Sequence, residues 1–483
     1  MKRFLKNFFV LSFSTIVINI IQTYLSAYIT QKLGTTFLGS FSLVNTLFKF
    51  LMTVSLFGVP LAITKLVSEN DTYDDKNSIV LISKIGCRIC ALSSAITCLI
   101  TIIFANKISS LVLPNFKDTK VIIVLALSLP FIAISSVFSG YFQALRKVNI
   151  NVIDEFLSEF SRAAILVLLI SLKYNSYIIF SISILISQIL SFLYTYVMFK
   201  IDISKNNYYR SDSFLLSKKI LKIALPISFT SFVRSGLSTL KHSLIPSRLE
   251  LYGFSKDYAL SRYGIVHGIA LPFVLIPWMI IECFASLILP EYSRYFAKKD
   301  TNKINSITNY IFEKTFWISI YISFFIYIIS NVVCFAIYSN SEVSYYVKIL
   351  CPLIPIMYID TIVDNMLRGL DLQLKVMQIN ILDVLVSIIL IYFGVPYLGT
   401  FGYILVIYAG EYLNGVLSIE ILLKNIDVKF NYIKWLFIPL ILGFLGLFIC
   451  NHIAFDSQII TLIIQIVIFS LVYLPFLRIK NKA

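Results

Sequence analysis

The chain has 483 residues, of which 58% are hydrophobic and only 14% are charged. Soluble domains carry about 25% charged residues, and the mean hydropathy here is +0.86, so the composition excludes a soluble protein and indicates a membrane protein. The formal net charge of +16 does not indicate nucleic-acid binding. The lysines and arginines lie at the ends of apolar stretches and form no basic stripe with interleaved aromatic residues.

About fourteen apolar stretches are long enough to cross a bilayer as helices. The first follows Lys2, Arg3 and Lys6, as in a signal peptide, but it continues to about Thr30 without a convincing small-residue cleavage site. We therefore expect a retained first helix. The expected spans are 5–30, 38–66, 79–104, 121–142, 153–172, 177–198, 220–246, 264–289, 312–337, 346–367, 376–394, 401–423, 433–450 and 458–476.

The basic residues indicate the orientation of these spans. Every second gap, together with both ends of the chain, holds about 26 lysines and arginines, whereas the other gaps hold about 8. The richer side is cytoplasmic by the positive-inside rule. We therefore expect both termini in the cytoplasm and an even number of spans.

A weak internal repeat divides the chain into two halves. At a shift of about 229 residues, six positions before or within an odd-numbered span correspond, five of them identical: Gly140, Leu145, Arg146, Ile150, Asn151 and Asp154 match Gly369, Leu374, Lys375, Ile379, Asn380 and Asp383. Chance similarity between helix starts is the alternative. Because six is an even number of spans, two copies of six helices have the same orientation and form a parallel repeat.

The prediction for the fold is an all-α integral membrane protein with two parallel six-helix repeats and two further C-terminal helices. Its expected parts are an N-lobe (1–199), a cytoplasmic linker (200–219), a C-lobe (220–424) and a pair of accessory helices (425–483). Two lobes of this kind are typical of alternating-access transporters.

Charged residues within the expected spans indicate a substrate cavity, because each costs about 2.5–3.5 kcal/mol at the bilayer centre. The seventh span has Arg234, Lys241 and His242 along one helical face, and the second has Lys49. Guanidinium and ammonium groups in a cavity suit phosphate or pyrophosphate. Further expected lining residues are Asn19, Gln22, Asn45 and Glu282. The alternative is that Arg234 and Lys241 pair with Glu282 and a carboxylate of the tenth span.

A second polar set, in the later spans, indicates ion coupling. Its carboxylates lie beside amide side chains and could bind Na⁺ or relay a proton; they are Asp360, Asp364, Asp383 and Glu411. On the fifth span, the spacing of Glu155, Glu159 and Arg162 indicates an internal ion pair. The pairs Asn151–Asp154 and Asn380–Asp383 are interpreted as caps or tethers of the neighbouring turns.

We interpret two prolines as kinks in a helix and the seven cysteines as packing residues. Pro272 and Pro277 bracket the middle of the eighth span and predict kinks, either gating or static. Cys87 and Cys90 form a C-x-x-C pair, but a redox or zinc site needs accessible thiolates and more ligands than three histidines readily supply. We therefore expect the cysteines to pack between helices, with no metal site and no cofactor beyond a coupling Na⁺ or H⁺.

Six segments resemble the stage V sporulation protein B family, in the polysaccharide-transporter branch of the multidrug/oligosaccharidyl-lipid/polysaccharide flippase superfamily. They are GVPLAITKLVSE (58–69), GYFQALRK (140–147), LIPSRLELYG (244–253), GIALPFVLIP (268–277), LIPIMYIDTIVDNMLRGLDLQ (353–373) and GTFGYILVIYAGEYL (399–413). The resemblance implies two six-helix lobes with two accessory helices, in a bacterial cytoplasmic membrane. It also implies export of undecaprenyl-pyrophosphate-linked saccharides or peptidoglycan precursor.

The chain departs from two patterns within this superfamily. Related lipid II flippases are thought to use cavity arginines on helices 1, 2 and 8, whereas here only Lys49 on helix 2 is comparable. Drug exporters often have a carboxylate on helix 1, and this helix 1 has none.

The resulting hypothesis is a flippase that moves a lipid-linked anionic glycan across the membrane by alternating access. We expect it to be a monomer that contacts membrane lipids and no nucleic acid, and not to be an enzyme. The alternatives are a cation-coupled multidrug exporter of the same superfamily and a non-transporting scaffold for cell-wall or spore-envelope assembly. A membrane-bound glycan polymerase or ligase is disfavoured, because such an enzyme should have a large outer loop with catalytic residues.

Overall fold

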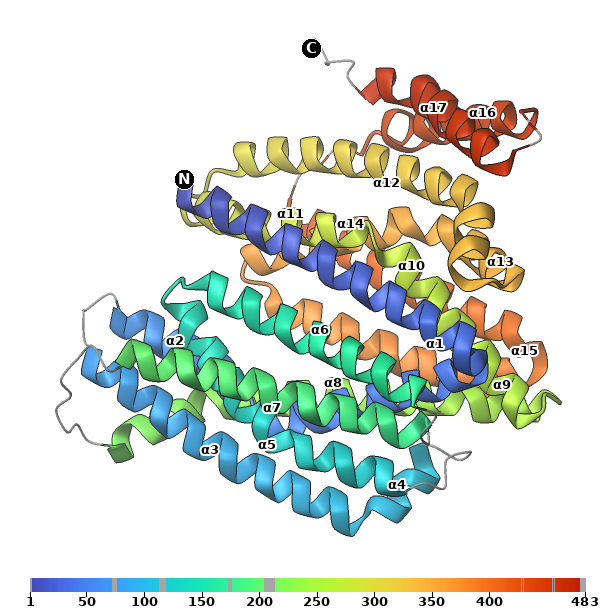
Figure 1. The fold of residues 1–483 in the computed structure, drawn as a ribbon. Helices are drawn as coiled ribbons and strands as arrows, with labels where there is room; N and C mark the ends of the chain where they lie inside the picture. The colour runs from blue at the N-terminus through green and yellow to red at the C-terminus, as the bar shows by residue number, and fades with distance from the viewer. Residues whose placement is uncertain are drawn as a thin grey trace. The chain divides into compact units, whose positions relative to one another are not determined.

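The computed structural model describes residues 2–71, 76–112, 119–172, 176–203, 213–426, 428, 430–453, 455 and 457–477. These residues form helices joined by short turns, and no strand occurs among them (Figure 1). This confirms the predicted all-α class. The physical reason is that hydrocarbon offers no hydrogen-bond partners, so a spanning segment must satisfy its backbone groups internally.

Eleven helical stretches of the described chain are long and apolar enough to cross a membrane. Helices α1 (Lys2–Leu56) and α15 (Gln373–Asn425) are each broken by a glycine with non-helical dihedrals, at Gly34 and Gly399, so each corresponds to two predicted spans. Helix α6 (Val148–Ser171) is not among the eleven, because four charged residues lower its apolarity. With these three adjustments the described helices are consistent with the predicted fourteen spans.

The chain divides into two compact units. Unit 1 comprises residues 1–29, 36–247 and 255–260. Its helix α5 packs against α2, α3 and α7, and α7 packs against α6. Besides α1 and α6, its helices are α2 (Val59–Asp71), α3 (Lys76–Ile103), α4 (Ala105–Val112), α5 (Thr119–Ala144), α7 (Ser176–Ile203), α8 (Ser213–Leu251) and α9 (Lys256–Tyr263).

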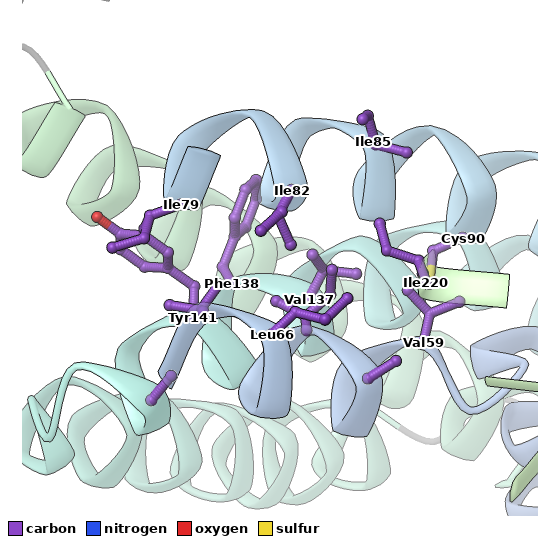
Figure 2. Close-up of a cluster of buried hydrophobic side chains, with 14 of the residues drawn as sticks. Val59, Leu66, Ile79, Ile82, Ile85, Cys90, Val137, Phe138, Tyr141 and Ile220 are labelled. Carbon is purple, nitrogen blue, oxygen red and sulfur yellow. The ribbon is translucent and has the colours of Figure 1, made fainter. Parts of the chain in front are cut away.

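The core of unit 1 is a cluster of aliphatic and aromatic side chains between α2, α3, α5 and α8 (Figure 2). Val59, Ile82, Val137 and Ile220, one from each of these helices, are almost fully buried. Burying a side chain of this size stabilises a packed structure by about 1.5–3 kcal/mol when the alternative is water. Between membrane helices the same contacts act mainly through close packing.

The second predicted span, 38–66, is broken in the structure between α1 and α2. Phe57 and Gly58 both have positive φ, 49° and 63°. A Cβ atom on Gly58 would lie 2.7 Å from the carbonyl oxygen of Ala224 on α8. Only glycine combines this backbone conformation with so close an approach, so Gly58 sets how α8 packs against the start of α2.

The turn between α5 and α6 has a counterpart in unit 2. The first turn has Arg146 at φ 57° and the second, between α14 (Ile354–Gly369) and α15, has Asp371 at φ 64°. These residues are 225 apart, whereas the matched Asn151 and Asn380 are 229 apart. The difference of four residues is about one helical turn and leaves a side chain near the same helix face.

The two matched asparagines make different hydrogen bonds. Asn151 donates its Nδ2–H to the backbone oxygen of Ser139 at 3.0 Å, across the turn. Asn380 donates to Val376 in its own helix at 2.9 Å. The tether expected at both turns forms only at the first. There Lys147 also pairs with Asp202, which accepts a hydrogen bond from Tyr141 at 2.7 Å.

Unit 2 comprises residues 30–35, 248–254 and 261–483. Helix α14 packs against α11, α12 and α15, and Trp278 on α11 donates its indole N–H to Thr361 on α14 at 2.7 Å. The further elements of unit 2 are η1 (Gly264–Ala270), α10 (Leu271–Leu275), α11 (Trp278–Ala297), α12 (Thr301–Tyr338), α13 (Ser341–Leu350), η2 (Cys351–Leu353), η3 (Ile433–Phe437), α16 (Ile438–Asn451) and α17 (Gln458–Leu477).

The predicted accessory helices pack against α12 in unit 2 (Figure 1). Trp317 on α12 and Phe469 and Tyr473 on α17 are buried together with Cys450 on α16. The hydroxyl of Tyr473 donates to the backbone oxygen of Trp317 at 2.9 Å. A second hydrogen bond, between the hydroxyls of Tyr321 and Ser470 at 2.9 Å, also joins α12 to α17.

The predicted eighth span is interrupted at both prolines. The π-helical η1 precedes Pro272, which lies in the first turn of α10, and Pro277 immediately precedes α11. Proline has no N–H to donate, so each position is compatible with a helix start but not with a helix interior. Two interruptions therefore occur where kinks were predicted, and a gating role for them remains a prediction.

The two compact units are defined by contacts between residues, whereas the predicted lobes are defined by the sequence repeat. Contacts place α8 as far as Ser247 with unit 1, although the predicted C-lobe begins at residue 220. Residues 204–212, most of the predicted linker, lie outside the described residues. The lobe boundaries therefore remain a prediction.

Gly58→Ala is expected to destabilise the protein. The left-handed backbone alone costs a residue with a side chain about 1–2 kcal/mol, and the close approach of the Ala224 oxygen adds overpacking. Thermal unfolding in detergent should therefore begin at a lower temperature. Gly394→Ala is the matched control, because its Cβ would meet nothing within 4 Å in a helix. An unchanged melting temperature in Gly58→Ala would contradict the assigned backbone conformation.

Candidate functional site

A polar cavity of about 340 Å³ lies within unit 1, between the second half of α1 and α8. Its volume is within the range of about 300–1,000 Å³ that is typical of small-molecule sites. The residues that line it are two cations and six hydroxyl-bearing side chains: Lys49, Arg234, Thr46, Thr53, Ser231, Ser235, Ser238 and Thr239.

Helical spacing brings these side chains to one surface. Ser231, Arg234, Ser235 and Ser238 follow the i, i+3, i+4, i+7 pattern of a single helix face. On α1, Thr46, Lys49 and Thr53 are spaced in the same way. The two helices meet at the rings of Phe50 and Phe232, whose centroids are 5.6 Å apart. An aromatic contact therefore holds two polar faces beside each other.

Lys49 and Arg234 are both exposed within the cavity. In the part of the chain that the structure describes, no carboxylate oxygen comes within 4.0 Å of either charged group. The alternative in which Arg234 is neutralised by a carboxylate therefore finds no support. Two positive charges share a small polar space, and this arrangement favours an anionic occupant.

The hydroxyl groups differ in what they offer a ligand. Thr46, Thr53 and Thr239 donate to backbone oxygens one turn earlier in their own helices, at 2.8–2.9 Å. Among the described residues, the side chains of Ser231, Ser235 and Ser238 have no such partner. Three serine hydroxyls beside Arg234 are therefore available as donors to an anion.

The predicted lining residues are only partly brought together. Lys241 and His242 lie farther along α8 and are not among the side chains that line this cavity. Asn19 donates to the backbone of Thr15 at 2.8 Å, and the half-buried Asn45 lies one turn before Lys49. Glu282 belongs to unit 2, where its charge interacts with those of Arg368 and Asp364.

Gln22 contacts an ion pair on α6. Its Nε2–H donates to Oε2 of Glu159 at 3.2 Å, and the same oxygen pairs with Arg162, as the i,i+3 spacing predicted. Both charged side chains are less than one-fifth exposed. Their charges also act on Lys49. The electrostatic neighbourhood of the cavity therefore extends from α1 and α8 to α6.

The four predicted ion-coupling residues do come together in unit 2. Asp360 interacts electrostatically with Asp364, Asp383 and Glu411. Two residues of α15 reach the α14 carboxylates, because Asn414 donates to Asp360 and Ser418 donates to Asp364, each at 3.3 Å.

One side of this acidic cluster is poorly satisfied. Asp360 is 8% exposed, and its Oδ1 and the Oδ1 of Asn414 are buried without a hydrogen-bond partner in the described structure. Unpaired buried acceptors are rare in proteins and indicate a proton, a cation or a water molecule. No group of three or more acidic, histidine or cysteine side chains among the described residues is arranged to hold a metal ion.

Comparison with known proteins agrees with this architecture. Residues 4–296 match the model of the polysaccharide biosynthesis protein family. The chain belongs to this family. Over 461 residues it is also 23% identical to stage V sporulation protein B of Bacillus subtilis (strain 168), with 89% of this chain and 86% of that protein aligned.

Two solved structures of transporters show the same fold as this polysaccharide biosynthesis family member. The lipid II flippase MurJ, in an inward closed conformation, aligns with a TM-score of 0.75 and 18% identity, over 96% of this chain and 97% of its own. An inward-facing multidrug transporter of the MATE family aligns with a TM-score of 0.69 and 14% identity, over 85% and 94%. The chain is therefore a multi-pass membrane protein with the fold of these transporters.

Sequence reasoning missed part of the lining of this cavity. The residues named for α8 were Arg234, Lys241 and His242, whereas the structure places Ser231, Ser235, Ser238 and Thr239 at the cavity with Arg234. The spacing of Ser231 and Ser235 around Arg234 was a usable signal. Because Lys241 and His242 are basic, the sequence analysis placed the cavity-lining face of α8 farther along the helix.

Thiol labelling tests the charge of the cavity. In a variant without native cysteines, Ser238→Cys should react faster with an anionic methanethiosulfonate than with a cationic one, because Lys49 and Arg234 concentrate anions there. Adding Arg234→Gln should reduce this preference several-fold. Ser243→Cys, which is buried on the same helix, should react slowly with both reagents. A preference that does not depend on Arg234 would contradict a cationic cavity.

Proposed function

We propose that this transporter is a flippase for a lipid-linked glycan whose pyrophosphate group binds in the cationic cavity. The observation that carries the proposal is the pair Lys49 and Arg234, which face the cavity with no carboxylate of the described residues within 4.0 Å. Pyrophosphate offers two adjacent groups of anionic oxygens. A guanidinium binds such oxygens in a bidentate manner and an ammonium binds them as a point charge.

The chemistry of the cargo explains the combination of a charged cavity and an apolar exterior. The prenyl tail stays in lipid, where the exposed apolar side chains of the helices already lie. The head group crosses within the protein, where charge and hydroxyl groups replace its water. We propose that the two lobes alternate in access, that both termini are cytoplasmic, and that the protein acts in a bacterial cytoplasmic membrane. Undecaprenyl-pyrophosphate saccharide or peptidoglycan precursor is the proposed cargo.

Multidrug export is the second candidate, because the fold also resembles solved MATE transporters. A cation-coupled drug exporter that carries cationic compounds needs an acidic or neutral aromatic cavity. In α1 there is no acidic residue, and the described cavity is lined by cations and hydroxyl groups. The charge of the site therefore favours an anionic cargo.

We further propose that Na⁺ or H⁺ couples to transport through the acidic cluster of unit 2. The supporting observation is the unsatisfied pair of oxygens on Asp360 and Asn414. A carboxylate in this position needs a positive partner, and either a proton or Na⁺ supplies one.

Arg234→Ala and Lys49→Ala are each expected to reduce leaflet exchange of a fluorescent prenyl-pyrophosphate saccharide at least tenfold in reconstituted vesicles. Losing one charge-assisted contact removes binding free energy of about 1.5–3 kcal/mol, and each 1.4 kcal/mol is tenfold in affinity.

Two controls make this result decisive. Expression and thermal unfolding of each variant show that the fold persists, and a neutral prenyl lipid without pyrophosphate shows whether the charge of the head group matters. Exchange at the wild-type rate in both Arg234→Ala and Lys49→Ala would reject the cationic-cavity mechanism.

Asp360→Asn is expected to remove the dependence of transport on an imposed ion gradient. The amide has the same shape as the acid but neither titrates nor carries charge. Transport by the wild type should rise with a Na⁺ gradient or with a pH gradient, and the variant should respond to neither. Glu420→Gln, an exposed pair partner of Lys424 on α15, is the control. A variant that keeps the full gradient response would rule out this coupling site.

A further inference from the structure

The ion pair Glu159–Arg162 on α6 has no role in the proposed function so far. The charges of both residues act on Lys49 of the cationic cavity, and that of Arg162 acts more strongly. Both side chains are less than one-fifth exposed. A half-buried ion pair needs an explanation, because desolvation offsets most of its attraction.

A hydrogen bond and an ion pair hold the carboxylate of Glu159 between α1 and Arg162. Its Oε2 accepts from Gln22 on α1 at 3.2 Å and from Arg162 one turn along α6. The Nε of Arg162 is buried without a hydrogen-bond partner in the described structure. The guanidinium is therefore held by one carboxylate oxygen at one end and is unsatisfied at another.

The charges around Lys49 explain why a carboxylate is present. Lys49 and Arg162 repel each other, and Glu159 is the one acidic group of the described chain that acts on Lys49. Glu155, one turn earlier on α6, interacts with Glu159 but is not among the groups that act on Lys49. In an empty cavity Glu159 thus offsets a repulsion that water alone would screen poorly.

We infer that Glu159 is the resident counter-ion of the cavity, and that Arg162 is a further anion-binding residue that Glu159 occupies until a pyrophosphate group takes its place. This rests on the proposed function. Pyrophosphate carries more negative charge than one carboxylate and offers oxygens for a bidentate contact, so it competes for the guanidinium. When pyrophosphate binds, it repels Glu159 and frees Arg162. When pyrophosphate leaves, Glu159 pairs with Arg162 again.

Such an exchange limits affinity, and a transporter must release its cargo. Without a competing carboxylate, three cations would hold the pyrophosphate and release would be slow. When the cavity is empty, Glu159 pairs with Arg162 and stabilises the unloaded protein. The free-energy difference between the loaded and the empty protein is therefore smaller. Glu159 thereby favours turnover at the expense of tight binding.

The test measures binding to the full-length protein in detergent by calorimetry, with inorganic pyrophosphate and farnesyl pyrophosphate as probes and farnesol as the tail-only control. Glu159→Gln should bind both pyrophosphates about tenfold more tightly, because it frees Arg162, and Arg162→Gln should bind them about tenfold more weakly. Arg162→Lys should restore part of the affinity. Farnesol binding should not change in any variant.

Glu155→Gln is the matched control, since it removes the same charge one turn away and should leave both affinities unchanged. Leaflet exchange gives a second readout: Glu159→Gln should lower the maximal rate together with the half-saturating substrate concentration. A merely structural ion pair would lower the melting temperature of Glu159→Gln and Arg162→Gln without these opposite shifts.

The outcomes separate the inference from the function on which it rests. Unchanged affinity in Glu159→Gln and Arg162→Gln, with binding lost in Arg234→Gln, overturns the counter-ion and leaves the cationic cavity intact. Absence of pyrophosphate binding in the wild type and in Glu159→Gln overturns both. Equal effects of Glu155→Gln and Glu159→Gln would show a general change of potential and also overturn the specific exchange.

Discussion

The structure depends on one constraint, which is that a charge within a membrane-spanning bundle needs either water or an opposite charge. Each unit of this membrane protein meets the constraint differently. In unit 1, Lys49 and Arg234 face a polar cavity, and the charge of Glu159 acts on Lys49. In unit 2, carboxylates around Asp360 cluster with amide and hydroxyl groups. The cavity of unit 1 is lined by cations, whereas the cluster of unit 2 is mainly acidic and includes an ion pair between Arg368 and Asp364 at 3.9 Å. A difference of this kind suits the proposed binding of an anion at one place and a small cation at another.

Glycine and proline decide where the polar faces lie. Gly58 permits a left-handed residue against the backbone of α8, so α8 can lie close to the break between α1 and α2. The same helix then meets α1 through Phe50 and Phe232, beside the cations. In unit 2, Pro272 and Pro277 divide what would otherwise be one span into η1, α10 and α11. Membrane bundles tolerate such breaks where neighbouring protein satisfies the backbone groups that they free.

The comparisons separate fold from chemistry. Flippase and multidrug transporter structures align over most of the chain at 18% and 14% identity, so the shared features are apolar packing and helix connection. Packing between membrane helices requires size and shape more than particular residues. The lining of a cavity follows the cargo instead. For that reason the charges of Lys49 and Arg234 bear more directly on the proposed cargo than the likeness of the fold to either kind of transporter does.

The sequence by itself determined the class of protein, the approximate spans and the set of acidic residues on α14 and α15, because hydropathy and helical spacing are local properties. It also indicated Lys49 and Arg234, since a charge in an apolar stretch is visible without a structure. Only the tertiary structure decided that Ser231 and Ser235 share the cavity while Lys241 does not line it. It likewise showed that Gln22 contacts a carboxylate of α6, and that Glu282 lies with Arg368. The physical reason is that which face a helix turns inward depends on its neighbours and on breaks such as Gly58, and those contacts join residues far apart in the chain.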